Sequence, residues 1–212
     1  MSALAKPSIM PGGIILAVLA AVCTFLVALT HSVTAPRIAA NDQAFLERSL
    51  APVLEGISYE GALSESTIVI APPHDLPGNG PVTIYRVYAG GGPVAALFVV
   101  TARDGFSGPI RLLVGVDAQG TVTGARVLEH RETPGLGDLI ESSKSDWILQ
   151  FNDRSLTNPP EPAWAIRRDG GDFDQLTGAS ITPRAVIRAI KETLIYFDRN
   201  QAAVFAEANS NE

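Results

Sequence analysis

The sequence contains a single cysteine, Cys23, among its 212 residues. One cysteine excludes an internal disulfide and a CxxC metal or redox centre. It also excludes an iron–sulfur cluster held by cysteines of this chain alone. Any redox chemistry must therefore depend on a cofactor that is bound without sulfur.

Basic residues are also few, since 16 lysines and arginines face 22 acidic residues and give a net charge of −6. This balance argues against a nucleic-acid partner, which requires basic side chains to replace the counterions of phosphates. The chain also lacks a dinucleotide-binding fingerprint, a Ser-His-Asp arrangement and a cluster of metal ligands. We therefore expect no catalytic residues and no metal site. A hydrophobic share of 46% and a charged share of 18% argue for a folded domain with one accessory segment.

Acidic residues are absent from residues 1–41, where Lys6 and Arg37 are the only strongly charged side chains. The 24 residues between Lys6 and His31 carry no charge. As a helix they would measure roughly 36 Å, enough to cross a hydrocarbon core of about 30 Å. A cleaved signal peptide is the alternative interpretation. We favour a retained span, because the apolar run is long and no clear cleavage site ends it.

The segment after the span predicts a stalk and then a separate domain. Thr34–Ile38 breaks the apolar pattern at Pro36, and a helical stripe follows, made of Ile38, Phe45, Leu46, Leu50, Val53 and Leu54. We therefore divide the chain into an anchor (1–33), a stalk helix (34–56) and a domain (57–212). The positive-inside signal is weak, but the acidic composition after the span favours a cytoplasmic N-terminus and an exported domain.

The rest of the chain predicts an α+β domain with an antiparallel sheet. Runs rich in β-branched residues indicate strands, and Asp117–Gly120 between two of them is typical of a hairpin turn. The predicted strands cover residues 82–88, 94–101, 110–116 and 121–128. A short helix is expected at 138–143 and a longer one at 183–205.

The segment that leads into the last helix offers a seat for a phosphate. Pro183 suits the first helical position, because it has no N–H to leave unpaired, and Thr182 would then be the N-cap. The first turn of a helix presents free N–H groups and a partial positive charge. Small residues and hydroxyls line the approach: Thr177, Gly178, Ala179, Ser180 and Thr182. An ordinary hydroxyl-capped helix is the alternative interpretation of this segment alone.

A second set of segments precedes this one: Asp104-Gly-Phe-Ser-Gly-Pro-Ile110, Val114–Asp117 with Gly120, and Leu128-Glu-His-Arg-Glu-Thr-Pro-Gly-Leu-Gly137. Together with Asp174-Gln-Leu-Thr-Gly-Ala-Ser-Ile-Thr182 they span most of the chain. This combination resembles the FMN-binding domain of the RnfG family, the G subunits of Rnf electron-transport complexes. It also resembles the related NqrC family of the sodium-translocating NADH:quinone reductase, whose members are usually longer.

The resemblance implies that FMN is attached through its phosphate to the hydroxyl of Thr182. Asp174, Thr177, Gly178, Ala179 and Ser180 would shape the turn that presents this hydroxyl. Family members more often have Ser at position 177 and Thr at position 180, and both exchanges keep a hydroxyl. The loop expected to hold the isoalloxazine edge through its backbone N–H groups contains Glu132, Thr133, Gly135, Leu136 and Gly137. A plain Pro-Gly turn is the alternative for this loop.

The resemblance also implies a setting for the protein. A flavin transferase would attach the FMN from FAD, and the domain would lie on the periplasmic side of a bacterial inner membrane. There the chain would relay electrons with the other proteins of an ion-translocating ferredoxin:NAD oxidoreductase, without being catalytic alone. The alternatives are the quinone-reductase component and a non-redox, membrane-tethered sensing module.

Four further side chains are assigned by their residue types. Trp147 and Trp164 could stack on a flavin, but such residues are more often part of a core. We expect His31 and His74 to be solvent or interface residues.

Overall fold

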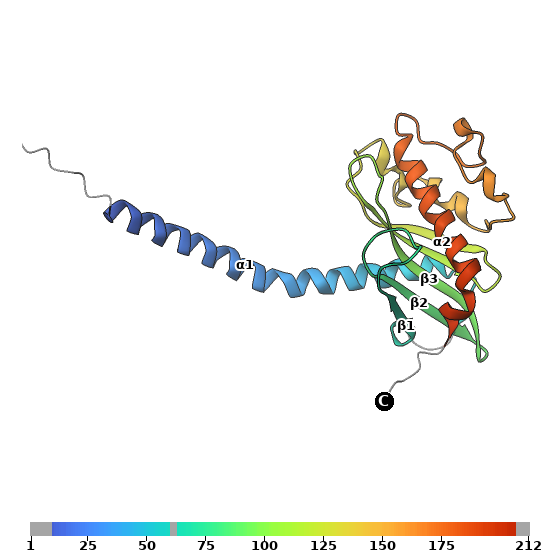
Figure 1. The fold of residues 1–212 in the computed structure, drawn as a ribbon, viewed down its shortest axis with the longest axis horizontal. Helices are drawn as coiled ribbons and strands as arrows, with labels where there is room; N and C mark the ends of the chain where they lie inside the picture. Colours follow the sequence, from blue (N-terminus) through green and yellow to red (C-terminus); the bar gives the residue numbers. More distant parts are fainter. Residues whose placement is uncertain (1–9, 60–62, 207–212) are drawn as a thin grey trace, which may run out of the picture. The chain divides into compact units, whose positions relative to one another are not determined.

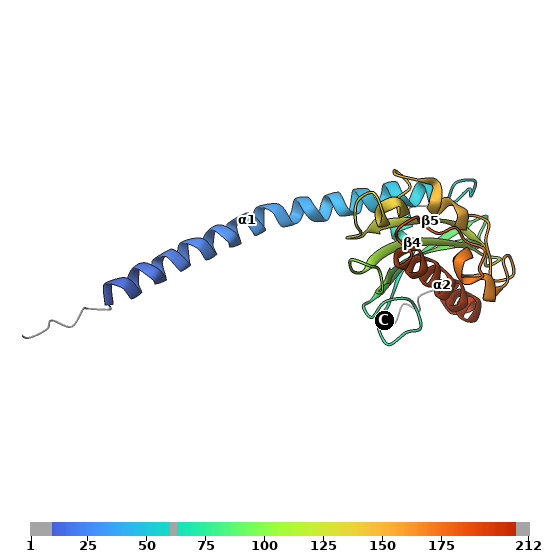
Figure 2. The same cartoon turned by 90° about the horizontal axis from the view of Figure 1, so that it is seen from above.

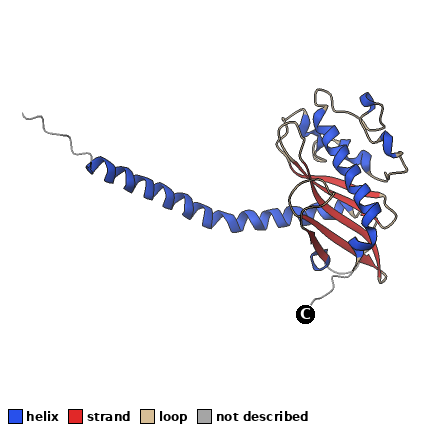
Figure 3. Cartoon of the chain, viewed as in Figure 1, coloured by secondary structure: helices blue, strands red, loops and turns tan. Residues whose placement is uncertain are grey.

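The structure is a computed structural model that describes residues 10–59 and 63–206. Its secondary structure is one long N-terminal helix, five strands, a series of short 3₁₀ helices and a C-terminal helix (Figures 1 and 3). The chain divides into two units, Met1–Phe45 and Leu46–Glu212. The α+β class predicted from the sequence is confirmed. The predicted boundaries at residues 33 and 56 stay predictions.

Helix α1 (Met10–Leu50) contains the apolar segment and continues beyond it. Residues Gly12–Arg37 are long and apolar enough to cross a membrane, with a mean hydropathy of 2.7. The helix continues through Pro36, the residue at which the apolar pattern breaks. A proline removes one helical hydrogen bond, but its fixed φ is compatible with the helix. The chain therefore carries one N-terminal apolar helix, which suggests a single-pass membrane protein.

The predicted stalk stripe lies partly in the folded domain. Leu50, Val53 and Leu54 are buried against the sheet, with Val87, Leu97 and Leu113 among their neighbours. The side chains of Ile38, Phe45 and Leu46 lie outside the described residues. The end of α1 and the short 3₁₀ helix after it (Ala51–Val53) thus supply one of the two hydrophobic cores.

The sheet is an antiparallel meander in the order β1-β2-β3-β4-β5. Its strands are β1 (Thr67–Ile70), β2 (Val82–Ala89), β3 (Gly92–Ala102), β4 (Ile110–Asp117) and β5 (Val122–Glu129). The four predicted strands are confirmed, and β1 was missed. The Asp117–Gly120 turn is also confirmed: Asp117 Oδ1 accepts hydrogen bonds from the backbone N–H groups of Gln119 (2.9 Å) and Thr121 (2.8 Å).

Both faces of the sheet are covered, which explains why β3 is buried on consecutive residues rather than on alternate ones. Helix α2 (Ile181–Phe205) lies across one face, against β3 and β4 (Figures 1 and 2). On this face Phe98 pairs in register with Val114 and meets Phe197 of the helix edge to face. The opposite face carries Leu97 and Leu113, which pack against Leu50 and Val53.

Between β5 and α2 the chain forms four 3₁₀ helices rather than longer elements: Gly137–Ile140, Asp146–Phe151, Glu161–Ala163 and Arg167–Asp169. The helix expected at 138–143 is the first of these, and it is shorter than predicted. The segment is stabilised by an aromatic cluster of Trp147, Phe151, Trp164 and Phe173, with ring centroids 4.8–6.3 Å apart. Both tryptophans are therefore core residues, as predicted.

Candidate functional site

The turn before α2 is tight and places residues 180–182 at the start of the helix. The N–H of Ala179 donates to the carbonyl of Leu176 (3.1 Å), and Gly178 has a φ of 82°. Only glycine adopts this left-handed conformation without strain. A Cβ at Gly178 would also lie 3.1 Å from the side chain of Leu136, in the neighbouring loop. Glycine at this position therefore lets the turn and the loop approach each other.

Thr182 is not the N-cap of α2, and in this the prediction was wrong. The helix begins at Ile181, the cap position belongs to Ser180, and no side chain caps the helix. Thr182 is the second helical residue, and it is fully buried. Pro183 fits the third position equally well, because none of the first N–H groups of a helix has a partner within it. Because Thr182 does not cap the helix, its hydroxyl can bond to a group outside the helix.

That hydroxyl donates to a carboxylate from a distant part of the chain. Thr182 Oγ1 lies 2.5 Å from Glu132 Oε2, and both residues are buried. The other carboxylate oxygen, Glu132 Oε1, accepts the backbone N–H of Ser107 at 3.0 Å. Hydrogen bonds to a charged partner are shorter and stronger than neutral ones. The carboxylate thus joins the start of α2 to two loops.

The loop from Thr133 to Gly137 is a closed turn. The carbonyl of Thr133 accepts the N–H groups of Leu136 (3.2 Å), Gly137 (3.1 Å) and Asp138 (3.4 Å). These three donors bond within the loop, which differs from the expectation that the N–H groups here are exposed. A Cβ at Gly137 would lie 2.8 Å from Glu132 Oε2 and 3.0 Å from Thr182 Oγ1. The loop therefore acts as a wall behind the Thr182–Glu132 pair.

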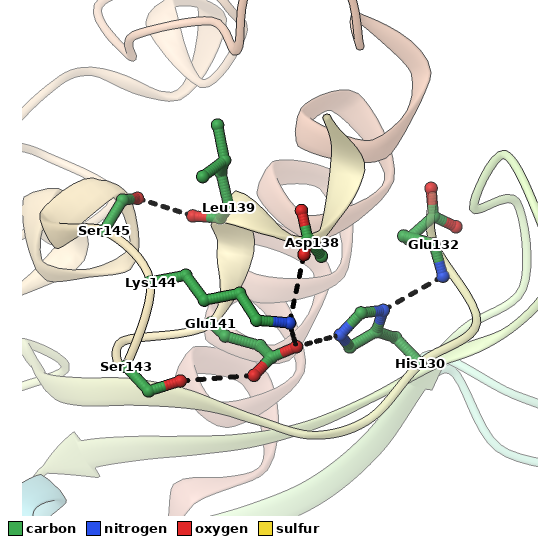
Figure 4. A network of polar contacts seen from close by, with 8 residues as sticks. All are labelled: His130, Glu132, Asp138, Leu139, Glu141, Ser143, Lys144 and Ser145. Atoms are coloured by element: carbon green, nitrogen blue, oxygen red, sulfur yellow. Dashed lines mark hydrogen bonds and ion pairs between the residues drawn. The ribbon is translucent and has the colours of Figure 1, made fainter. Parts of the chain in front are cut away.

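A network of charged side chains supports the loop from behind (Figure 4). The backbone N–H of Glu132 donates to His130 Nδ1 (3.0 Å), so the imidazole carries its proton on Nε2 and donates it to Glu141 Oε1 (2.7 Å). Lys144 Nζ contacts the same Glu141 oxygen (2.5 Å) and Asp138 Oδ2 (3.0 Å). These contacts fix the position of the Glu132 backbone.

The pKa values of this network follow from its contacts. Hydrogen bonding by the Lys144 ammonium lowers the pKa of Asp138. For Glu141, burial acts to raise the pKa, but the hydrogen bonds from Lys144 and His130 outweigh it and the net pKa is lowered. The hydrogen bond to Glu141 raises the pKa of Lys144. All three groups are therefore held in their charged forms at neutral pH.

A pocket of about 160 Å³ opens at this site. Its wall combines small residues, hydroxyls and a partly exposed apolar rim. The rim is made of Phe106, Leu136 and Ile181, whose exposed fractions are 66%, 42% and 46%. The pocket is lined by Phe106, Glu132, Thr133, Leu136, Gly137, Gly178, Ala179, Ser180, Ile181 and Thr182.

These features fit a phosphate with an aromatic ring attached. Gly137 and Gly178 leave room that a Cβ would fill. The first turn of α2 contains no acidic residue of its own, and the one carboxylate that lines the pocket beside its partial positive charge is Glu132, from the neighbouring loop. The apolar rim would contact the ring, while Thr133, Ser180 and Thr182 offer hydroxyls.

Comparisons with known proteins agree with this geometry. Residues 105–195 match the family model of the FMN-binding domain, and residues 1–53 match that of the RnfG N-terminal region. The chain belongs to the RnfG family.

Relatives of similar length support this membership. The chain is 41% identical to the G subunit of an ion-translocating oxidoreductase complex from Pseudoalteromonas atlantica, over 96% of this chain and 95% of the relative. Proteins of the same name from Shewanella loihica and Pseudomonas aeruginosa are 42% and 40% identical. The match to the Shewanella loihica protein covers 92% of this chain and 92% of the relative. The match to the Pseudomonas aeruginosa protein covers 97% of this chain and 96% of the relative.

Eight of the eleven predicted site residues of this RnfG-family chain line the pocket, and three do not. Asp174 is exposed and forms an ion pair with Arg167 (2.9 Å), while its carbonyl accepts Trp147 Nε1 (2.6 Å). It secures the segment before the turn rather than the pocket. Thr177 and Gly135 are exposed and lie outside the pocket lining.

The sequence reasoning missed two pocket residues, Phe106 and Ile181. Phe106 lies within the segment Asp104–Ile110 that carried the RnfG resemblance, and this was the available signal. Ile181 is an apolar residue that is exposed at a helix start, which a sequence cannot show. Among the histidines, His31 is exposed as expected. His74 is partly buried, and its Nε2 is 2.9 Å from the carbonyl of Gly80 within its own loop.

Proposed function

We propose that the RnfG-family chain carries FMN joined to Thr182 by a phosphoester and relays electrons within an ion-translocating oxidoreductase complex. The relatives are named as G subunits of such complexes, so the partners would be the other proteins of the complex. FMN supplies the redox chemistry, and the chain supplies its binding and orientation. The match to the RnfG N-terminal region favours this function over the quinone-reductase component. No described contact favours a non-redox sensing module.

The observation that carries the proposal is the position of the Thr182 hydroxyl. It lies in the first turn of α2, in the wall of the pocket, and inside the segment that matches the FMN-binding domain. An esterified phosphate keeps a negative charge, which the helix N-terminus stabilises by about 0.3–1 kcal/mol or more. The apolar rim of Phe106, Leu136 and Ile181 would contact the isoalloxazine ring.

The proposal includes where the flavin is attached and by what. The domain would lie on the periplasmic side of the inner membrane, where a flavin transferase attaches FMN from FAD. A covalent bond keeps the cofactor in a compartment that does not supply free FMN. The single N-terminal apolar helix, Gly12–Arg37, would hold the domain at the membrane beside its partners.

The test is Thr182→Val, which removes the only atom of this side chain that could form the ester and keeps nearly the same shape. We expect no covalent flavin. Because a buried hydrogen bond to a charged group is lost, the free energy of unfolding should fall by about 1.5–3 kcal/mol. Flavin fluorescence of the denatured protein in a gel, after co-expression with a flavin transferase, measures the attachment.

The matched control is Thr177→Val, since Thr177 is exposed and outside the pocket lining. This variant should keep most of its covalent flavin. A folded Thr182→Val protein that fluoresces as strongly as the wild type would place the attachment elsewhere, and Ser180→Ala would then be the next variant to examine.

A further inference from the structure

Glu132 is the only ionisable side chain among the described residues that line the pocket. It is 5% exposed, and it faces Thr182, which is fully buried. Its Oε2 accepts the Thr182 hydroxyl at 2.5 Å, at the short end of O–H···O⁻ hydrogen bonds. A carboxylate at this distance can take the hydroxyl proton without any side-chain movement.

The carboxylate is also held in one orientation. Its Oε1 accepts the N–H of Ser107, and the Glu132 backbone is fixed through His130. Gly137 leaves no space behind it, since a Cβ there would lie 2.9 Å from Glu132 Cβ. Geometry of this kind is needed for general base catalysis, in which the base must lie within hydrogen-bond reach of the proton that it abstracts.

We propose that Glu132 is the general base for flavin attachment: it orients Thr182 Oγ and takes its proton when the phosphoester forms. This inference rests on the proposed attachment of FMN to Thr182. In the step, Thr182 Oγ forms a bond to the FMN phosphorus of FAD and the diphosphate bond of FAD breaks. AMP leaves with the bridging oxygen. The hydroxyl proton passes to Glu132 Oε2, and nothing is oxidised or reduced.

The same geometry determines where the proton stays afterwards. Once Thr182 Oγ is esterified it has no hydrogen to donate, and a phosphodiester with a negative charge lies beside Glu132. An ionised carboxylate would then face a like charge with no donor between them, which is costly in a buried site. Glu132 therefore keeps the proton and donates it towards the ester oxygen. Glu132 therefore accepts a hydrogen bond from Thr182 in the flavin-free protein and donates one in the flavin-loaded protein.

The test compares initial rates of covalent flavin formation in the full-length protein, with purified flavin transferase and FAD, followed by intact mass. Glu132→Gln keeps the shape of the side chain and removes the base, so the rate should fall by about 100-fold or more. Glu132→Asp keeps a carboxylate and should recover part of the rate. Glu129→Gln makes the same exchange on an exposed residue at the end of β5 and should react at the wild-type rate.

A pH series separates a base from a residue with only a structural role. The ratio of the Glu132→Gln rate to the wild-type rate, with the same transferase preparation, should rise with pH as solvent hydroxide replaces the missing base. The transferase's own pH dependence cancels in this ratio. A ratio that does not change with pH, or a Glu132→Gln rate equal to the wild-type rate, would overturn the proposal.

A measurement on the wild type keeps the proposal testable if Glu132→Gln does not fold. Infrared difference spectra of loaded minus unloaded protein should gain a protonated carboxyl band that shifts when glutamate is labelled with ¹³C. The absence of such a band would overturn it. The Thr182→Val protein separates a failure of the proposed attachment site from a failure of the proposed role of Glu132. If Thr182→Val still acquires flavin, the proposed attachment to Thr182 fails. If it does not, and Glu132→Gln reacts normally, only the role of Glu132 fails.

Discussion

Gly137 shows how closely the parts of the site are fitted to one another at the scale of single residues. It belongs to the loop that walls the pocket, yet its missing side chain is what allows Glu132 and Thr182 to meet. A Cβ would lie 2.8 Å from one carboxylate oxygen and 3.0 Å from the threonine hydroxyl. Ordinary Cβ contacts are longer, so the pair could not stay where it is.

We therefore expect Gly137→Ala to impair flavin attachment as well as stability. Overpacking of a buried site costs about 1–3 kcal/mol, and the shift needed here separates Thr182 from Glu132. Chemical denaturation measures the loss of stability, and in-gel flavin fluorescence measures the loss of flavin attachment. The control is Gly135→Ala in the same loop, where φ is 76° and no atom lies within 4 Å of the added Cβ. That variant should lose about 1 kcal/mol from backbone strain and keep its flavin.

The charged network behind Glu132 predicts a dependence of stability on pH. The pKa values of Asp138 and Glu141 are lower in the folded state, so their contribution is present above their unfolded pKa of about 4 and is lost as the pH falls through the folded values. The pKa of Lys144 is raised, so its contribution is lost only as the pH rises through the folded value, above about 10.4. Between roughly pH 5 and 9 Asp138, Glu141 and Lys144 are all charged.

Lys144→Met should therefore lower the Tm by a constant amount between about pH 5 and pH 9. The difference from the wild type should shrink below about pH 4, because the partner carboxylates become protonated in both proteins. Lys191→Met removes another ammonium–carboxylate contact, 3.2 Å from Glu161, and controls for the loss of one positive charge. Thermal unfolding followed at a series of pH values provides the measurement. A Tm difference that does not shrink at all as the pH falls below about 4 would contradict this explanation.

At the scale of elements, the end of α1 and the 3₁₀ helix after it are part of the domain's own core. Val53 lies over Gly115 and Gly124, which are paired across β4 and β5, and a Cβ at Gly115 would overlap the Val53 side chain. Leu50 and Leu54 cover Leu97 and Leu113 on the same face. Without this segment, Leu97 and Leu113 would lose much of the apolar cover on this face of the sheet.

A fragment of residues 46–212 should therefore fold, and one of residues 57–212 should not fold stably. Full burial of each of Leu50, Val53 and Leu54 contributes about 1.5–3 kcal/mol. Their sum is comparable to the total stability of a typical domain, about 5–15 kcal/mol. Urea unfolding followed by tryptophan fluorescence compares the two fragments. Equal midpoints would show that the stalk segment does not stabilise the sheet.

The elements also show what the sequence reveals and what it does not. Strands β2 to β5 are long runs with clear turns between them, and they could be predicted. β1 has only four residues and lies beside an irregular loop, so no periodicity indicates it. The start of α2 was misplaced because a proline fits several positions of a first turn. The Glu132–Thr182 bond joins residues 50 apart in the chain, and only the folded sheet brings them together.

At the scale of the whole molecule, charge and hydropathy separate the two ends of the chain. Residues 1–41 contain no acidic side chain, and the rest carries all 22. An apolar helix long enough to span a membrane lies in the first part, and the site lies in the second. Positive residues flank the span on both sides, so the topology depends on small differences. If a periplasmic flavin transferase makes the attachment proposed at Thr182, the domain must lie on the periplasmic side.

Selective labelling of cysteines would determine this topology. The only native cysteine, Cys23, lies within the span and is first changed to alanine. Gln119→Cys then places one thiol on the exposed turn between β4 and β5, and Ser8→Cys places one before the span. In cells with a permeabilised outer membrane, a maleimide that cannot cross the inner membrane should label Gln119→Cys and spare Ser8→Cys. Both should react after detergent lysis. The reverse pattern would put the domain in the cytoplasm, where a periplasmic transferase could not reach Thr182.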